Sequence, residues 1–594
     1  MTNDLDQELR IFTSEAVKSL YGPEVSANEI VVNVTRKEFE GDLSVVVFPY
    51  TKFSKKSPEQ TAAAIGEFIK EKWPVVSHFN VVKGFLNIVF TDQFWLEYLK
   101  GSREDAHFGK SASTNNKVVL EYCGPNTNKP LHLGHIRNMV IGYSMANIKA
   151  AAGDEVHKVN IYNDRGIAIC KSMLAWEKFG NGETPESSGI KGDHLIGKYY
   201  VEFDRVYRDQ IEKMKKKGLG DDEAKKEAPI IKEAQEMLRK WEAGDPETLQ
   251  LWSTMNGWVY EGFEETFRIL GVDFEKDYYE SEMYLKGKSL VKEGLDKGIF
   301  YKKSDNSVWV DLTDAGLDEK VLLRSDGTSV YLTQDLGTAQ ARYEDYKMDE
   351  SIYVVANEQD YHFKALKLTL QKLREPFADG IHHLSYGMVD LPTGKMKSRE
   401  GTTVDADDLV KEMMDTAETH TKELGKIEGF TESEAKELYR KLGLGALKYF
   451  LLRVNPKKRI LFEPEESIQF QGDTGPFIQY TYARIQSVLR KWKEAGRKGS
   501  GYSDALDPLE REIILFIQRY PLTIRESAEQ YDPSQIANYV YNLAKAYNKF
   551  YAELSILNAD DDDTASFRIQ LSDMTARVIK SAMTLLGIEV PDRM

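Results

Sequence analysis

A strand, a tight turn and a helix in immediate succession constrain this chain more than any other segment. Lys117 to Cys123 is a short run of mostly apolar, often β-branched residues, which is typical of a buried parallel strand. A Gly-Pro pair ends it, and residues 136–152 have helical length and stop at Gly153. Such a unit directs unpaired backbone N–H groups and the positive end of a helix dipole at one spot, which favours an anion such as phosphate.

Two histidines stand at the start of that helix. His132 and His135 are three positions apart on its first turn, so both imidazoles can donate hydrogen bonds to one phosphate chain. Gly134, between them, leaves space for a flat base against the backbone. We interpret the segment as a nucleotide site rather than as two ordinary surface histidines.

The sequence around these histidines is more specific than the four residues from His132 to His135. Residues 124–138 read Gly-Pro-Asn-Thr-Asn-Lys-Pro-Leu-His-Leu-Gly-His-Ile-Arg-Asn. This run resembles the HIGH-type signature of class I aminoacyl-tRNA synthetases, and its long form resembles that of arginyl-tRNA synthetases. A bare His-x-Gly-His would be weak evidence, because nucleotidylyltransferases carry similar tetrapeptides.

A second segment carries the cations of a phosphate-transfer site. Gly394 to Gly401 reads Gly-Lys-Met-Lys-Ser-Arg-Glu-Gly and resembles the KMSKS loop of class I synthetases, with Ser398 where the second lysine is expected. Cationic side chains on such a loop can stabilise pyrophosphate as its charge develops. Which cation replaces the missing lysine stays open. The resemblance implies the catalytic residues His132, His135, Lys395 and Lys397, and an ATP site formed by His132, Gly134, His135, Lys395, Met396, Lys397 and Ser398.

The resemblance also implies an arginine site. A guanidinium group offers five donors in a planar fork and requires carboxylates and a flat surface. Tyr331 and Asp335 stand four positions apart, on one face of a helical turn, and could supply both. The positions that match the family's arginine site are Glu121, Asn126, His135, Glu280, Tyr331, Asp335 and Gln359.

Chemistry suggests a role for each of these arginine-site residues. We expect Asp335 to pair with the guanidinium, with Glu280 or Glu121 in support, and Tyr331 to form the flat wall. The amide side chains of the set would hold the α-amino and carboxylate groups. Residues 163–168, Asn-Asp-Arg-Gly-Ile-Ala, lack the tryptophan and glutamine that many family members have there, which leaves local contacts to the adenylate or the tRNA end open.

The pattern of strands and helices predicts a multidomain α/β protein, because 594 residues exceed one core. Strand candidates at 117–123, 156–162, 351–356 and 382–389 alternate with helices, which predicts a doubly wound parallel sheet of Rossmann type. An α+β N-terminal domain and an all-α C-terminal domain are expected on either side. In the first block we predict strands at 31–34, 43–48 and 85–90 and a helix at 58–72 that Ser57 caps.

Four domains follow from these patterns and from the resemblance. We expect an additional N-terminal domain in contact with the tRNA elbow at 1–113, and the catalytic domain at 114–406 with a helical insertion around 165–300. Connecting helices in contact with the tRNA stem are expected at 407–470, and a helical anticodon-binding domain at 471–594.

Composition excludes several other classes of protein. Cys123 and Cys170 are the only cysteines, so neither a disulfide framework nor a cysteine-rich zinc site is possible. No apolar run is long enough for a membrane span and the N-terminus lacks signal-peptide features, so we expect a cytoplasmic protein without membrane contact. A net charge of −16 opposes binding to nucleic acid unless basic groups cluster locally. The candidate clusters are Arg453, Lys457, Lys458 and Arg459, and Arg490, Lys491, Lys493, Arg497 and Lys498.

These observations predict an enzyme that joins arginine to tRNA(Arg). The arginine carboxylate would attack the α-phosphate of ATP, supplied with Mg²⁺, and the resulting adenylate would pass to the terminal adenosine of the tRNA. No protein-bound metal is expected, and we expect a monomer. Another class I synthetase, such as a cysteinyl enzyme, would need zinc ligands that two cysteines cannot supply. A catalytically silent RNA-binding paralogue would be expected to lose His132, His135 or the Lys395 loop, which this chain retains.

Overall fold

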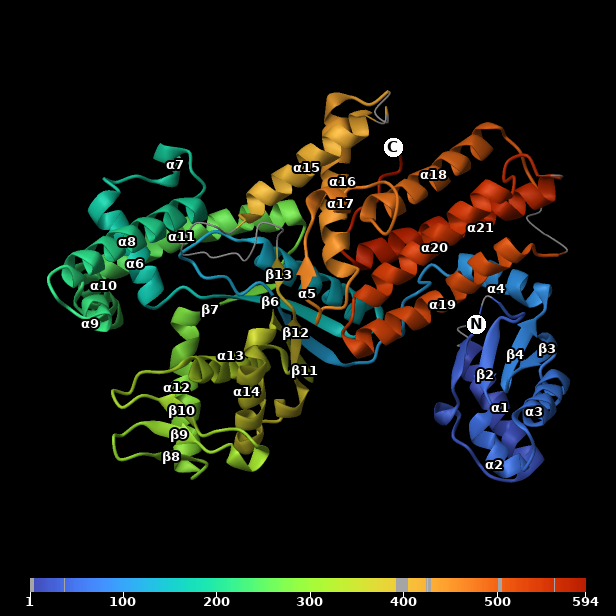
Figure 1. Ribbon diagram of the computed structural model, residues 1–594, viewed down its shortest axis with the longest axis horizontal. Coiled ribbons are helices and arrows are strands. Elements are labelled where there is room, and N and C mark those ends of the chain that lie inside the picture. Colours follow the sequence, from blue (N-terminus) through green and yellow to red (C-terminus); the bar gives the residue numbers. More distant parts are fainter. Residues whose placement is uncertain are drawn as a thin grey trace.

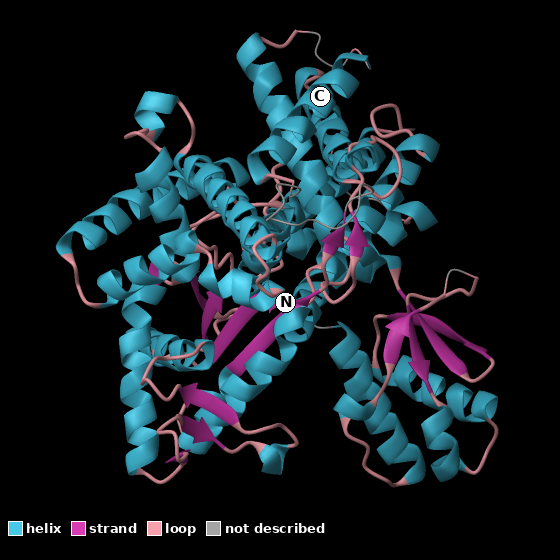
Figure 2. Cartoon of the chain, turned by 60° about the vertical axis from the view of Figure 1, so that its left-hand side comes forward, coloured by secondary structure: helices cyan, strands magenta, loops and turns pink. Residues whose placement is uncertain are grey.

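The computed structural model describes residues 5–36, 38–390, 404–423, 425, 429–499, 505–559 and 561–594. Figure 1 shows an N-terminal lobe of strands and helices at one end, a central sheet flanked by helices, and a helical C-terminal region that lies between them. Figure 2 shows that the strands of the N-terminal lobe form a sheet of their own, apart from the central one. The predicted multidomain α/β fold is confirmed. Among the described residues, no helix has both the length and the apolar character needed to cross a membrane.

The N-terminal lobe is a four-stranded antiparallel sheet packed against helices, in the order β1-β2-β4-β3. Its elements are α1 (Leu5–Tyr21), β1 (Val32–Val34), β2 (Leu43–Val46), α2 (Thr51–Ser54), α3 (Pro58–Lys72), β3 (Val76–Val82), β4 (Phe85–Phe90) and α4 (Asp92–Glu104). The predicted helix and its Ser57 cap are confirmed, since Ser57 and Gln60 form a capping box. Strand β3 was missed because it is a partly exposed edge strand without a continuous apolar run.

The central sheet has five parallel strands in the order β12-β11-β5-β6-β7. They are β5 (Lys117–Glu121), β6 (Glu155–Tyr162), β7 (Lys276–Tyr279), β11 (Glu350–Ala356) and β12 (Ile381–Tyr386). Helix α5 (Leu133–Ala151) follows β5. The strand order reverses at β5, with β6 on one side and β11 on the other, and such a reversal opens a crevice at the carboxyl ends of the strands.

A block of helices separates β6 from β7. It comprises α6 (Ile167–Phe179), α7 (Pro185–Ser188), α8 (Gly192–Lys215), α9 (Asp221–Glu227), α10 (Pro229–Glu242) and α11 (Pro246–Leu270). The helical insertion that the sequence predicts around 165–300 therefore ends sooner, because β7 already pairs with β6 from Lys276 onward. Strand β7 reads Lys-Asp-Tyr-Tyr, and so short a segment has no apolar run by which it could be recognised.

Two helices after β7 approach each other unusually closely. They are α12 (Glu280–Asp296) and α13 (Tyr331–Tyr346), with β8 (Phe300–Lys302), β9 (Val308–Val310) and β10 (Lys320–Leu323) between them as an antiparallel sheet. A Cβ on Gly287 would lie 1.9 Å from the Thr333 carbonyl oxygen, and one on Gly337 would lie 2.5 Å from the Gly287 nitrogen. Only glycines allow this crossing, which brings the first turns of both helices to the crevice.

The remaining elements extend the central region and form a helical bundle. Strands β13 (Val389–Asp390) and β14 (Ile460–Leu461) pair in parallel, so the predicted strand 382–389 is two elements, β12 and β13. The helices are α14 (Asp360–Leu373), α15 (Ala406–Glu423), α16 (Glu432–Leu452), α17 (Pro464–Ser467), α18 (Gly475–Glu494), α19 (Pro508–Gln530), α20 (Ser534–Glu553) and α21 (Asp562–Leu585).

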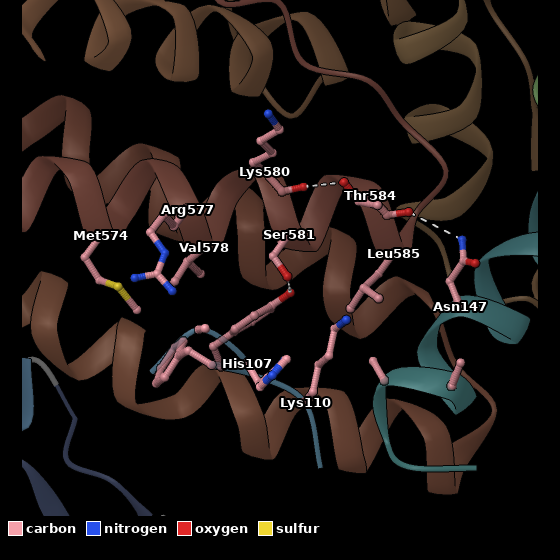
Figure 3. A pocket seen from close by; sticks show the side chains of 15 residues that line it. His107, Lys110, Asn147, Met574, Arg577, Val578, Lys580, Ser581, Thr584 and Leu585 are labelled. Atoms are coloured by element: carbon pink, nitrogen blue, oxygen red, sulfur yellow. Dashed lines mark hydrogen bonds between the residues drawn. The ribbon is translucent and has the colours of Figure 1, made fainter. Parts of the chain in front are cut away.

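Arginines join the bundle to the N-terminal part of the chain. Arg511 of α19 donates to Asp42 at 3.1 Å and also pairs with Asp92. Arg577 of α21 donates to the carbonyl oxygens of Arg103 and Asp105, both at 2.8 Å, beside the cavity shown in Figure 3. Asp42 is 3% exposed, so the carboxylate that Arg511 neutralises is almost inaccessible to water.

Replacing Arg511 with Ala should destabilise the contact between the N-terminal lobe and the bundle. Because a buried carboxylate would lose its counter-ion, we expect a loss of about 3 kcal/mol and a lower melting temperature by calorimetry. Arg205→Ala is the control, since the Arg205–Glu202 pair is largely exposed and should matter by less than about 0.5 kcal/mol. Equal effects of the two substitutions would contradict this account of the interface.

Candidate active site

Reciprocal hydrogen bonds hold the turn that carries the two histidines. His132 is the N-cap of α5: its Nδ1 accepts from the Gly134 N–H at 3.1 Å, and its own N–H donates to His135 Nδ1, also at 3.1 Å. The two ring centroids are 3.9 Å apart. A Cβ on residue 134 would lie 2.9 Å from His132 Cε1, so the imidazole itself requires the glycine.

Both imidazoles are neutral donors. Because each Nδ1 accepts a backbone hydrogen bond, each ring carries its proton on Nε2. Burial, assisted by the positive charge of Lys129, lowers the pKa of His132 to about 4. Burial, assisted by His132, lowers the pKa of His135 well below its ordinary value. The turn therefore presents two Nε2–H donors at a helix N-terminus without adding charge.

Lys129 was not among the predicted site residues. Its charge acts on both imidazoles, and it lines a cavity of about 640 Å³ together with His132 and Asp405. A cation at this point would stabilise an anion held by the turn. The signal for it was present in the sequence, since Lys129 stands three positions before His132 within the recognised run.

The second predicted segment is described only at its flanks. On one side the chain reaches Asp390 at the end of β13. On the other, the Leu133 N–H donates to the Val404 carbonyl at 3.2 Å, and the Ala406 N–H donates to the Leu131 carbonyl at 3.0 Å. The residues after this segment are thus paired directly with the histidine turn. Four predicted site residues lie outside the described residues: Lys395, Met396, Lys397 and Ser398.

Predicted arginine-site residues lie at the carboxyl ends of the central strands. Glu121 closes β5, Glu280 directly follows β7, and Gln359 ends the short helix η4 (Asn357–Gln359) after β11. Asp335 lies one turn into α13, close enough for its charge to raise the pKa of Glu280. Only the parallel sheet brings together these separate parts of the chain.

Glu121, Glu280 and Asp335, which we call the acidic slot, have different partners. Glu280 is 8% exposed, and burial, above all, raises its pKa to about 7. The Asp335 Oδ2 lies 2.5 Å from His362 Nε2. Glu121 pairs with Arg342, which is completely buried, so its charge is already neutralised inside the protein. Arg342 is permanently charged, whereas His362 is charged only when protonated, so Glu280 and Asp335 are the acidic pair that a bound cation would meet.

The other predicted members stand at the rim of the slot. Tyr331 is the first residue of α13 and is 77% exposed. Asn126 is also exposed, and a backbone bridge pairs it with Asn163 at the end of β6. Gln359 is exposed as well. These side chains are placed to contact a ligand from outside the acidic pair.

Asp164 is a buried connector that the sequence reasoning did not assign a role. Its carboxylate accepts from the Ser281 N–H at 2.9 Å, from Ser281 Oγ at 2.8 Å and from the Tyr260 hydroxyl at 3.1 Å. It is completely buried, and burial raises its pKa against the effect of these hydrogen bonds. Asp164 thus fixes the first turn of α12, and with it the adjacent Glu280.

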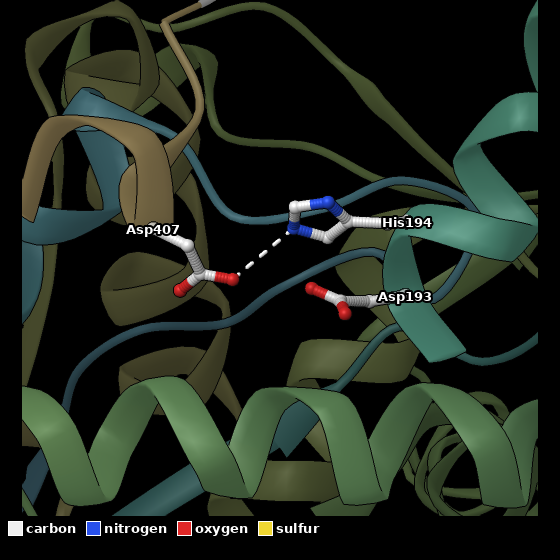
Figure 4. A group of neighbouring side chains, drawn as sticks. All are labelled: Asp193, His194 and Asp407. Atoms are coloured by element: carbon white, nitrogen blue, oxygen red, sulfur yellow. Dashed lines mark hydrogen bonds and ion pairs between the residues drawn. The ribbon is translucent and has the colours of Figure 1, made fainter. Parts of the chain in front are cut away.

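A group of acidic and histidine side chains between α8 and the start of α15 forms a salt-bridge network. Asp193, His194 and Asp407 lie close together (Figure 4) and could in principle hold a metal ion. Lys191 already occupies the position of a cation, with its Nζ 2.6 Å from Asp407 and 3.5 Å from Asp193. His194 Nε2 lies 3.1 Å from Asp407 and 3.3 Å from Asp405. The network ties α8 to the start of α15, and we assign no metal to it.

Comparison with known proteins identifies the family. The model of the class I tRNA synthetase (R) catalytic domain matches residues 102–463. The DALR anticodon-binding domain matches residues 478–594, and the arginyl-tRNA synthetase N-terminal domain matches residues 7–90. The chain is 54% identical to the arginine–tRNA ligase of Amoebophilus asiaticus, with 100% of both chains covered. The chain belongs to the arginyl-tRNA synthetases.

Further similarities extend over the whole of this arginyl-tRNA synthetase family member. The arginine–tRNA ligase of Bacteroides fragilis is 54% identical, with 99% of this chain and 100% of the relative covered. The structure of the Thermus thermophilus arginyl-tRNA synthetase has the same fold, with a TM-score of 0.81 at 24% identity over 99% of this chain and 100% of that one. The predicted family is confirmed. The chain carries an ATP-using catalytic domain and an anticodon-binding domain for tRNA.

The imidazole of His132 should titrate near pH 4 in nuclear magnetic resonance spectra, with the neutral form protonated on Nε2. Because its folded pKa lies below the ordinary 6.5, its contribution to stability is complete above pH 6.5 and is lost as the pH falls towards 4. The His132→Gln variant assigns the resonance. Titration near 6.5 would mean that the turn is open to water.

Proposed function

We propose that this protein joins L-arginine to tRNA(Arg) in two steps, using ATP. The observation that supports this most directly is the adjacency of two sites in one crevice: neutral imidazole donors at the N-terminus of α5, and an acidic pair, the buried Glu280 and the half-buried Asp335. A helix N-terminus with N–H donors suits phosphate, and an acidic slot suits a guanidinium. The full-length similarity to arginine–tRNA ligases agrees with this assignment.

In the first step, the carboxylate of arginine attacks the α-phosphate of ATP, which enters with Mg²⁺ as part of the substrate, and pyrophosphate leaves. His132 and His135 would donate Nε2–H hydrogen bonds to the phosphates, and the backbone at Gly134 would lie beside the nucleotide. Lys129 would supply positive charge from the same turn, and Lys395 and Lys397, with Met396 and Ser398, would also contact the phosphates. Positioning and charge stabilisation suffice, because no covalent enzyme intermediate forms.

Arginine would be recognised by its planar cation. With a pKa of about 7, Glu280 is protonated in about half of the molecules at neutral pH in the empty slot, and a guanidinium beside it would stabilise the ionised form. Asp335 would accept a second pair of N–H donors, while Tyr331 would close over the ligand from the rim. Asn126, Gln359 and His135 would hold the α-amino and carboxylate groups, and Glu121 would act from behind through Arg342.

In the second step, the arginyl group passes to the terminal adenosine of tRNA.

A cavity of about 470 Å³ between α18 and the segment after α20 is suited to an unpaired anticodon base. The Arg484 guanidinium lies 4.8 Å from the ring centroid of Tyr480 and 4.9 Å from that of Tyr551, which is 42% exposed. Arginine and exposed aromatic rings are favourable for stacking on RNA bases.

The remaining assignments follow the domain organisation expected from the sequence. Residues 1–113 would contact the tRNA elbow, residues 407–470 the stem, and residues 471–594 the anticodon. The protein would act as a monomer in the cytoplasm.

Amino-acid-dependent exchange between ATP and pyrophosphate tests this function. The full-length protein is assayed with each of the common amino acids, with and without tRNA(Arg), and attachment to tRNA is then followed with the active one. Exchange and attachment are expected with arginine alone. Exchange driven by another amino acid would overturn the assignment, and no exchange under any condition would favour a catalytically silent RNA-binding protein.

Replacing Asp335 with Asn should raise the KM for arginine by about 100-fold, because the bound guanidinium would lose a charged partner. The KM for ATP should change by less than about threefold. Glu344→Gln is the matched control, since Glu344 lies on the same helix but pairs with Lys286 at the surface. Equal increases in both KM values would contradict the proposed slot.

The affinity for arginine should depend on pH through Glu280. The pKa of its carboxyl is raised to about 7, so the empty slot is protonated below that pH and arginine must displace the proton. Binding should weaken by about tenfold per unit below pH 7 and level off above it. Calorimetric titration in buffers of different ionisation enthalpy measures the released proton. Glu280→Gln should bind weakly at every pH, and a wild-type affinity without pH dependence would rule out this role.

A further inference from the structure

Arg137 lies on the second turn of α5, two positions after His135, and is completely buried. Its Nη1 donates to the carbonyl oxygens of Gly387 at 2.5 Å and Met388 at 3.0 Å. Its Nη2 donates to those of Pro456 at 3.1 Å and Lys458 at 2.7 Å. One guanidinium therefore holds four backbone carbonyls from two segments that are far apart in the chain.

The two segments are the entries to β13 and β14. These strands pair at Val389 with Ile460 and at Asp390 with Leu461. The Gly387 N–H donates to the Pro456 carbonyl at 2.9 Å, and a Cβ on Gly387 would lie 2.7 Å from the Lys458 carbonyl carbon and oxygen. The backbones are thus in direct contact, and Arg137 binds across their junction.

Burying a guanidinium without a carboxylate partner costs more free energy than filling this space with an apolar side chain. Within the described part of the chain, Arg137 has no acidic partner, and burial lowers its pKa to about 10. Four carbonyl dipoles take the place of a counter-ion, and an apolar side chain would avoid the cost of removing the charge from water. Such a residue is best explained by what it positions, because its planar fork fixes both distance and direction.

The same helix start also determines the other flank of residues 391–403. Leu133 and Leu131, on either side of His132, form the backbone hydrogen bonds to Val404 and Ala406 described above. Arg137 fixes the flank at β13, and these two leucines fix the flank before α15. The positions of both flanks therefore depend on contacts with the first two turns of α5, which carry His135 and Arg137, and with the adjoining residues Leu131 to Leu133.

We propose that Arg137 is a positioning residue for adenylate formation, which holds the β13–β14 junction in register with the histidine turn. The proposal rests on the proposed function, because the register matters for the in-line transfer of phosphate. Lys395 and Lys397 follow Asp390 by five and seven positions in the sequence. A shift of the junction would move Asp390, the last described residue before them. It would leave in place α12 and α13, which carry Glu280 and Asp335.

Arginine-dependent ATP–pyrophosphate exchange by the full-length Arg137→Lys variant tests this role. A lysine places its donors on one nitrogen and cannot span two segments, so kcat should fall on the order of 10- to 100-fold. The KM for arginine should stay within about twofold, because Glu280 and Asp335 lie on α12 and α13, which carry none of the four carbonyls that Arg137 binds. Arg577→Lys is the matched control (Figure 3), since the two hydrogen bonds of Arg577 among the described residues also go to backbone carbonyls, outside the active site. Its kcat should stay within about twofold of the wild type.

Two outcomes would overturn the proposal. One is a kcat for Arg137→Lys that matches that of Arg577→Lys. The other is a rise in the KM for arginine comparable to the fall in kcat, which would indicate general loosening of the site. If Arg137→Lys does not fold, Gly387→Ala disturbs the same junction from the opposite side, and wild-type kcat in that folded variant also refutes the proposal. These assays contain tRNA(Arg), and absence of arginine-dependent exchange in the wild-type protein both with and without it would instead refute the proposed function.

Discussion

The hydrogen-bonded first turn of α5 is the element on which the active site depends. Backbone N–H groups that a helix normally leaves unpaired are bound here by imidazole nitrogens, and this assigns the proton of each ring to Nε2. The turn is formed where the central strand β5 ends, at the reversal of strand order. A structural need of the helix and a chemical need of the phosphate site are thus met by the same two residues, His132 and His135.

Local salt bridges, and not the net charge of the chain, decide which basic side chains are available to RNA. The chain has a net charge of −16, yet Arg490 and Lys491 line the cavity next to Tyr551. Several basic residues of the predicted clusters are engaged within the protein: Arg453 pairs with Glu466, Arg459 with Asp390 and Arg497 with Asp562, and Arg490 donates to the Asp592 carbonyl. The positive groups suited to RNA are therefore a subset that the sequence could not separate from those used in folding.

Buried polar groups connect the functional parts to one another. Asp164 links β6, α11 and the start of α12, and Arg137 links α5 to the β13–β14 junction. Neither contacts the acidic pair or the imidazole rings directly through a described hydrogen bond. Their geometry restricts the elements that carry those groups, and a low dielectric makes each misplaced partner costly.

Local sequence determined the elements and the chemistry of the nucleotide turn. The β-branched run of β5, the capped helix α3 and the fifteen residues from Gly124 to Asn138 were sufficient for the family and the fold, because their signals are short-range. Tertiary structure alone decided which of the predicted carboxylates are neutralised by a permanent cation: Arg342, 221 positions away, pairs with Glu121, whereas the crossing of α12 and α13 leaves Glu280 and Asp335 as the acidic pair. The physical reason is that burial and charge pairing depend on residues distant in sequence, which no local pattern encodes.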